Sequence, residues 1–185
     1  MADQRLHRAH PVDLELRGGD GRTLTGLAVP FDAPTQIREA GRRYTEVFRR
    51  GAFARSIRER GDRIKLLANH DRRRLPIGRA ELLREDAAGL YGEFRVSQTD
   101  AGDEVLALVR DGALDGLSIS FEPLRDHWST DRSEVERLEA KLVEVSAVAF
   151  PAYDGAVITG VRADSRSLPV EDAERRLGLI TRSLR

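Results

Sequence analysis

The sequence predicts a mainly β fold of the α+β class, in which roughly seven or eight short strands form an antiparallel sheet or barrel with two or three helices outside it. Apolar residues recur at every second position in several short segments, which is the pattern of half-buried strands. Turn-forming residues join neighbouring segments in hairpin-like succession. The regular alternation of strands and helices that would favour a parallel sheet is lacking.

The first half of the chain carries the clearest strand and turn signals. Its predicted elements are, in order, a strand at residues 12–17, a turn at 18–21, a strand at 23–31, a loop to 39, a short strand at 44–48, a short helix from 53 to 61, a strand at 64–70 and a hairpin of strands at 77–84 and 90–96. The turn at 18–21 is rich in glycine, which accepts the positive φ angles of hairpin turns. Pro30 and Pro34 favour the loop, because proline cannot donate to a strand ladder.

The second half contains one clear helix and two clear strands. Residues 105–109 switch to helical spacing, with Asp100 as the predicted N-cap and Gly112 as the C-terminal stop. Residues 117–121 and 143–149 return to alternation. The chain is therefore divided as follows: a flexible N-terminal tail at 1–11, one domain at 12–163, and a linker with a C-terminal helix at 164–185.

Composition excludes several classes of protein. The chain has no cysteine, so disulfides, thiol catalysis and cysteine zinc sites are excluded. No stretch approaches the roughly 20 apolar residues of a membrane helix. The 31 basic and 31 acidic residues give a net charge of zero, which disfavours nucleic-acid binding. Paired-histidine metal motifs and glycine-rich phosphate loops are also missing, so we expect neither a metal nor a cofactor.

Histidines are the first candidates for chemistry, because the chain has only four of them. His7 and His10 fall in the predicted tail. His127 lies in a polar stretch after a predicted strand, where an exposed loop residue is the simpler interpretation. His70 ends an apolar run and is flanked by polar residues. It could exchange protons from that fixed position, or it could only hydrogen-bond a turn.

Without cysteine, a nucleophile would have to be a hydroxyl or a carboxylate. Ser118 and Ser120 share the polar face of the predicted strand 117–121, although ordinary polar alternation gives the same pattern. Glu144 lies on the polar face of its strand and could orient a histidine, or it could be a plain surface glutamate. The same parity rule puts His70 on an apolar face. His70 and Ser118 can therefore meet only if the strand turns or ends at His70.

Six short motifs occur in an order that resembles the prohead (capsid maturation) proteases of tailed phages, relatives of the herpesvirus assemblins. They are GLAVPFD at 26–32, EVF and GAF within 46–53, NHD and PIG within 69–78, ED and GL within 85–90, DG and GLSISF within 111–121, and LVEVS and PA within 142–152. The resemblance spans about residues 24–162. One departure is Ser120, which stands where glycine is common in the family.

The resemblance implies a serine endopeptidase with an assemblin-like antiparallel β-barrel of about seven strands, surrounded by a few helices. By motif, Ser118 would be the nucleophile and His70 the general base. The assemblins carry a further histidine in the third role. Here the corresponding stretch offers Glu144 as the residue that orients His70, with His127 as the competitor.

The resemblance also implies partners and a location. The substrates would be a scaffold protein or the scaffold-like segment of the major capsid protein, and the enzyme's own termini, with the tail at 164–185 as a self-cleavage region. Cleavage would take place inside the procapsid, in the cytoplasm of the bacterial host. A homodimer is implied loosely, whereas a nucleic-acid or membrane partner is not expected. The alternatives are a non-catalytic capsid-assembly or scaffolding protein of the same fold, and a hydrolase that uses Glu144 with another carboxylate.

Overall fold

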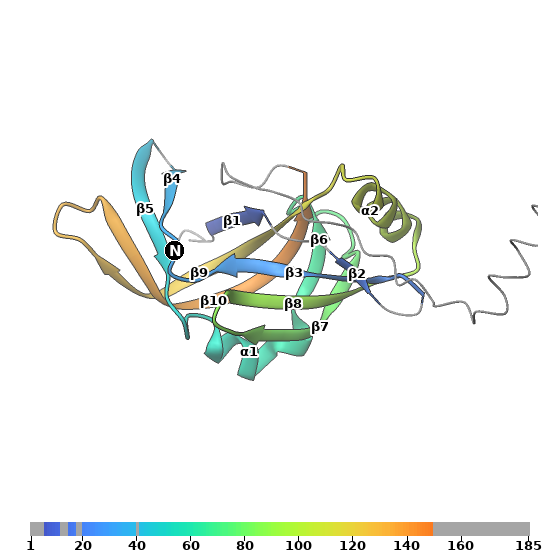
Figure 1. The fold of residues 1–185 in the computed structure, drawn as a ribbon, viewed down its shortest axis with the longest axis horizontal. Coiled ribbons are helices and arrows are strands. Elements are labelled where there is room, and N and C mark those ends of the chain that lie inside the picture. The colour runs from blue at the N-terminus through green and yellow to red at the C-terminus, as the bar shows by residue number, and fades with distance from the viewer. Residues whose placement is uncertain (1–5, 12–14, 18–19, 40, 150–185) are drawn as a thin grey trace, which may run out of the picture.

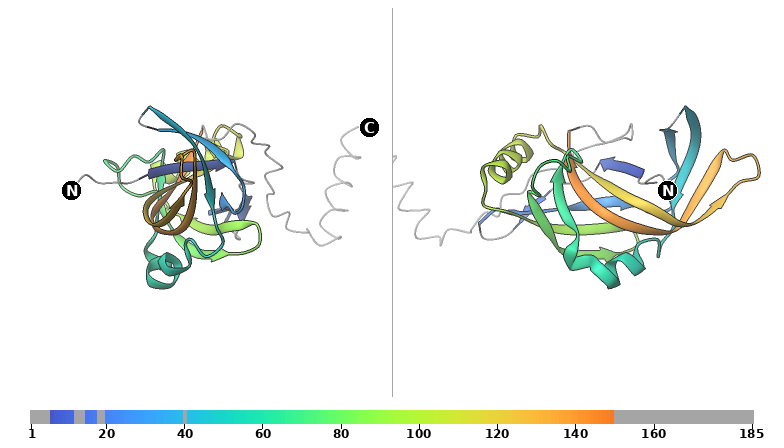
Figure 2. Two further views of the ribbon diagram at one scale, coloured as in Figure 1. Left: turned by 90° about the vertical axis from the view of Figure 1, so that its left-hand side faces the viewer. Right: turned by 180° about the vertical axis from the view of Figure 1, so that it is seen from behind.

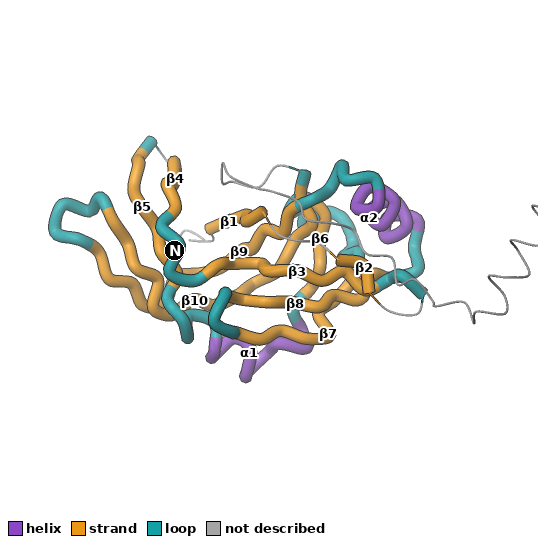
Figure 3. Tube along the Cα trace, viewed as in Figure 1, coloured by secondary structure: helices purple, strands orange, loops and turns teal. Residues whose placement is uncertain are grey.

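The computed structural model describes residues 6–11, 15–17, 20–39 and 41–149 (Figure 1). Its elements are β1 (Leu6–Pro11), β2 (Glu15–Arg17), β3 (Thr23–Pro30), β4 (Thr35–Glu39), β5 (Arg42–Phe48), α1 (Ala54–Arg60), a 3-10 turn (Gly61–Arg63), β6 (Lys65–Ala68), β7 (Gly78–Glu85), β8 (Gly89–Val96), α2 (Asp100–Arg110), β9 (Gly116–Trp128) and β10 (Glu134–Val148). Strands dominate the described residues, as predicted (Figure 3). None of the helices found there is long and apolar enough to span a membrane. The expected helix at 170–184 lies outside the described residues.

The described strands form one open sheet rather than a barrel. Its hydrogen-bonded path runs β1-β9-β10-β6-β7-β8-β3-β2, and β4 and β5 branch from it because β5 pairs with β10. The predicted barrel of about seven strands is therefore not confirmed, and ten strands are present in the described part of the chain. β2 pairs with β3 from Thr23 to Thr25 on the edge opposite β8.

The two longest strands, β9 and β10, pair with each other along most of their length and extend beyond the main body of the sheet (Figure 2). Most neighbouring strands pair antiparallel, as predicted, but β10 pairs in parallel with β5 at one end and with β6 at the other. Only the second half of β10 shows strand alternation in the sequence, because polar residues in the first half hide it. The loop predicted before residue 39 is also wrong at its end, since β4 pairs with β5 as a hairpin.

Between its two parallel partners, β10 is bordered by the segment that leads into α1. The carboxylate of Glu85 fixes this segment by accepting hydrogen bonds from the backbone N–H groups of Gly51 (2.9 Å) and Phe53 (2.7 Å). Phe53 is fully buried, and the backbone of Ala52 accepts a 2.8 Å hydrogen bond from Ala140 in β10. The segment 51–53 thus borders β10 on the edge opposite β9, between the parts of β10 that pair with β5 and with β6.

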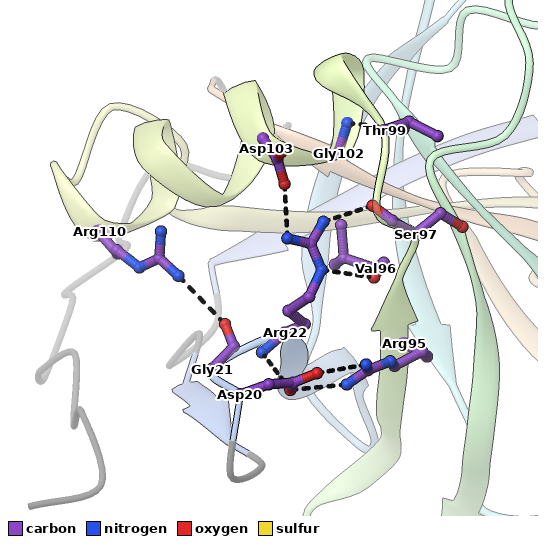
Figure 4. Close-up of polar contacts among 10 residues, drawn as sticks. All are labelled: Asp20, Gly21, Arg22, Arg95, Val96, Ser97, Thr99, Gly102, Asp103 and Arg110. Atoms are coloured by element: carbon purple, nitrogen blue, oxygen red, sulfur yellow. Dashed lines mark hydrogen bonds and ion pairs between the residues drawn. The ribbon is translucent and has the colours of Figure 1, made fainter.

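Helix α2 leads directly into β9, and polar contacts fix its first turn (Figure 4). Its N-cap is Thr99 rather than the predicted Asp100, because the Thr99 hydroxyl accepts from the Gly102 backbone N–H at 3.2 Å. Arg22 binds Asp103 of the same turn at 2.5 Å. These contacts tie the helix to the start of β3, and the helix in turn sets where β9 begins.

A buried arginine joins the main core to the extension of β9 and β10. Arg137 is 2% exposed, and its guanidinium binds Glu46 at 2.6 Å and Asp126 at 2.5 Å. Its carbon Cζ lies 5.6 Å from the ring centre of Phe121 in the main core and 5.7 Å from that of Trp128 in the extension. Burial raises the pKa of Asp126, whereas the neighbouring Arg137 favours its charged form.

We expect Arg137→Met to destabilise the protein by about 3–5 kcal/mol, because it leaves the fully buried Glu46 carboxylate without its cation. Urea unfolding followed by tryptophan fluorescence measures this change, since Trp128 is the only tryptophan. Replacing Glu46 by Met as well should restore part of the loss. A single variant as stable as the wild type would contradict the expectation.

Candidate active site

Ser118 lies near the start of β9, the second strand of the sheet path, with Leu117 and Ile119 directed into the core. Its register partner on β10 is Ser146, and Ser120 is opposite Glu144. These four polar residues form a block on the face of the sheet opposite the core, and all four are buried, with Ser118 only 1% exposed. The parity prediction for this strand is therefore confirmed.

A β-bulge in β10 brings Glu144 onto this face. Leu142 pairs with Phe121 and Glu144 with Ser120, so Val143 is an extra residue that reverses the alternation. Ser56 of α1 supports the bulge. Its hydroxyl accepts from the Leu142 N–H at 2.9 Å and donates to the carbonyl of residue 140 at 3.1 Å.

His70 reaches the same face because β6 ends two residues before it. Asn69 and His70 both have left-handed backbone conformations, with φ of +49° and +57°. Such angles are strained for residues other than glycine. Two hydrogen bonds to β10 hold them, from the Asn69 N–H to the Ala147 carbonyl (3.0 Å) and from the His70 N–H to the Ser146 hydroxyl (3.1 Å). The condition set by parity, that the strand end at His70, is met by this turn.

The side chains form a continuous chain of hydrogen bonds. Nε2 of His70 lies 2.5 Å from Oγ of Ser118, and Nδ1 lies 2.6 Å from Oε1 of Glu144. The other carboxylate oxygen, Oε2, accepts a 2.8 Å hydrogen bond from the Ser146 hydroxyl. The carboxylate is buried, whereas the imidazole is 20% exposed and so faces solvent along one edge. With the Nδ1 proton directed at Glu144, Nε2 can accept the hydroxyl proton of Ser118.

His127, the competitor for the third role, lies elsewhere. It is in the outer part of β9 with its side chain 72% exposed, and its Nδ1 is 3.6 Å from Glu136. His7 and His10 belong to β1, whose backbone pairs with β9. Among the described residues, no group of three His, Asp or Glu side chains could hold a metal ion.

The contacts of Ser146 were not predicted from the sequence. Its hydroxyl contacts both the backbone of His70 and the carboxylate of Glu144, so it joins the two residues next to Ser118. The available signal was parity, because Ser146 shares a face with Glu144 two positions earlier in the same strand.

Comparisons with known proteins identify the family of the chain and a likeness of fold. A family model described as the caudovirus prohead serine protease matches residues 11–169. The prohead protease of Enterobacteria phage HK97 is 26% identical over 127 residues, and the match covers 67% of this chain and 56% of that protein. The solved structure of the bacteriophage T4 capsid assembly protease has a TM-score of 0.52 at 17% identity, covering 80% of this chain and 98% of its own, which is a likeness of fold. Because the family model covers most of the sequence, the chain belongs to the caudovirus prohead serine protease family.

Proposed function

We propose that the chain is a serine endopeptidase in which Ser118 is the nucleophile, His70 the general base and Glu144 the residue that orients His70. The observation that carries the proposal is the unbroken hydrogen-bond chain from Oγ of Ser118 through both ring nitrogens of His70 to Glu144. Membership of a serine protease family supports it.

In the proposed reaction, Oγ of Ser118 attacks a peptide carbonyl carbon while Nε2 of His70 takes the hydroxyl proton. The resulting imidazolium is stabilised by the Glu144 carboxylate beside Nδ1. It then gives its proton to the leaving amine as the C–N bond breaks, which leaves an acyl-enzyme on Ser118. Water attacks the acyl-enzyme with His70 again as the base, and this step releases the acid product and restores the serine.

We further propose that the substrates are polypeptides of the assembling phage capsid. The support is that the HK97 relative is a prohead protease and that the T4 neighbour is a capsid assembly protease. A scaffold protein, the scaffold-like segment of the major capsid protein, and the enzyme's own termini are the expected targets. The reaction would take place inside the procapsid in the host cytoplasm. Homodimerisation and the relation to the assemblins stay predictions.

Co-expression with the capsid protein encoded beside it tests this function. Wild type should trim the capsid protein or itself, Ser118→Ala should leave both intact, and mass spectrometry of the products gives the cut sites. Identical fragments from the wild type and from Ser118→Ala would show that Ser118 is not the nucleophile. Co-assembly without any cleavage would favour the non-catalytic scaffolding alternative.

Ser146→Ala is expected to lower kcat by about 10²-fold, because misplacing catalytic groups by about 1 Å has an effect of that size. The change removes the hydroxyl that joins the His70 backbone to Glu144. The KM should change little, since the Ser146 hydroxyl is engaged with the His70 backbone and the Glu144 carboxylate rather than available to the substrate. Steady-state kinetics on a peptide from the mapped cut site measures both constants.

Ser146→Thr is the matched control for this prediction, because it keeps the hydroxyl. It should retain most of the wild-type kcat, and thermal unfolding of both variants separates positioning from a loss of folded protein. If the alanine and threonine variants were equally slow, the hydroxyl would not be the group that matters.

A further inference from the structure

The N-terminal strand runs along the edge of the strand that holds Ser118. β1 pairs antiparallel with β9 over its whole length, from Leu6 opposite Phe121 to Pro11 opposite Gly116, and Ala9 is the register partner of Ser118. The other edge of β9 is occupied over the same residues by β10. Among the described residues, both edges of β9 beside Ser118 are therefore filled, one of them by the chain's own N-terminal segment.

The proposed nucleophile is buried in this form of the enzyme. Ser118 is 1% exposed and its neighbour Ser120 is fully buried, although a hydroxyl nucleophile must come within about 3–3.5 Å of the carbon that it attacks. A polypeptide substrate in extended form binds most simply by adding a strand to a sheet edge, where main-chain hydrogen bonds hold it whatever its sequence. Near Ser118, one edge of β9 is paired with β10 and the other edge is paired with β1.

Of these two neighbours, β1 is the one that can leave. β10 is paired with β9 along almost its full length and carries Glu144 and Ser146. β1 is six residues long, stands at the end of the sheet path and, among the described strands, pairs with β9 alone. Strands of this kind open locally at lower free energy than central ones.

We propose that the edge of β9 from Gly116 to Phe121 is the docking site for the main chain of an extended polypeptide substrate, and that β1 occupies this site in the free enzyme and leaves when substrate binds. The inference rests on the proposed function and adds to it where the substrate backbone lies. A substrate residue would take the place of Ala9, directly beside Ser118. In the free enzyme, β1 then occupies the substrate site in most molecules. The apparent affinity for substrate is lowered because only the fraction with β1 undocked can bind it.

Removing residues 1–11 tests the proposal on the peptide from the mapped cut site. The truncated enzyme should show a kcat/KM at least about tenfold higher than the full chain, mainly through a lower KM. A synthetic peptide with the sequence of residues 6–11 should inhibit the truncated enzyme competitively and the full chain weakly. Equal kcat/KM values for the two forms would overturn the inference.

A reversible cross-link keeps the test decisive if the truncated chain does not fold. His7 and Ser120 are register partners, and directly opposed residues of antiparallel strands lie about 4.5–5.5 Å apart at Cα, within the range of a disulfide. The chain has no cysteine, so His7→Cys combined with Ser120→Cys gives a single possible disulfide. The oxidised form should lose at least about tenfold in kcat/KM and regain it on reduction, because β1 can no longer leave.

Each single-cysteine variant serves as the control, since it carries the side-chain change without the cross-link. Unchanged cleavage by the fully oxidised double variant would overturn the inference and leave the protease assignment in place. Labelling of Ser118 by a small serine-directed phosphonate measures the reactivity of its hydroxyl, and it does so without the need for a peptide to dock. If no form cleaves peptide or is labelled, the proposed function fails together with the inference.

Discussion

Replacing Ser118 by alanine is expected to lower kcat by about 10⁶-fold, which is the size of effect seen when a triad nucleophile is removed from a serine protease. The change deletes the hydroxyl oxygen that lies 2.5 Å from Nε2 of His70. The covalent route is then closed, and only the residual rate from substrate binding and orientation remains. Single-turnover cleavage of the mapped peptide at excess enzyme measures this loss without interference from product release.

Ser120→Ala is the matched control for this variant. Ser120 lies two positions further along β9, on the same face, and is also buried. Its hydroxyl has no hydrogen-bond partner within the described residues, so its removal should leave kcat within about twofold of wild type. If Ser118→Ala cleaved as fast as Ser120→Ala, the nucleophile would lie elsewhere, and a hydrolase built on Glu144 and a second carboxylate would become the better account.

The sequence predicted the faces of β9 and β10 because side chains in a strand alternate with a period of two, whatever the rest of the fold does. Ser118 and Glu144 were placed correctly on the polar face for this reason. The bulge at Val143 was not visible, yet the prediction for Glu144 survived it because the residues after the bulge alternate normally. Parity within a short segment is thus reliable, whereas the register between segments is not.

From the sequence, His70 could be placed beside Ser118 only on the condition that its strand turns or ends at His70. Two consecutive left-handed residues, neither of them glycine, turn the chain after β6. Asn and His accept such angles more readily than most residues, but nothing local requires them, and the contacts that hold them come from Ala147 and Ser146, more than 70 positions away. A conformation that depends on distant hydrogen bonds leaves no local signal.

The open path of the sheet has a similar cause. A barrel and an open sheet of the same strands share their alternation and turn signals, so only the pairing at the two ends distinguishes them. Here β2 pairs with β3 and β1 pairs with β9. The pairing of β1 with β9 joins segments more than 100 residues apart, and no turn residue or spacing in either segment indicates it.

Glu144→Gln is expected to lower kcat by about 10⁴-fold while the fold stays intact, as for the equivalent change in a serine protease triad. The carboxylate accepts from Nδ1 of His70 across 2.6 Å, and this contact keeps the ring proton on Nδ1, so that Nε2 can take the Ser118 proton. An amide in the same place can turn its NH₂ group toward Nδ1. The ring then carries its proton on Nε2, where it cannot act as the base, and the imidazolium formed during the reaction loses its neighbouring negative charge.

The same strand provides a control with matched chemistry in Glu136, another glutamate with a histidine neighbour. Its carboxylate lies 3.6 Å from Nδ1 of His127, and Glu136→Gln makes the identical change there. This variant should keep wild-type kcat, because His127 is exposed and Glu144, not Glu136, lies beside His70. Comparing kcat for the two glutamine variants therefore decides between the histidines. A loss confined to Glu144→Gln assigns the orienting role to Glu144, whereas a loss of similar size in Glu136→Gln would return it to His127.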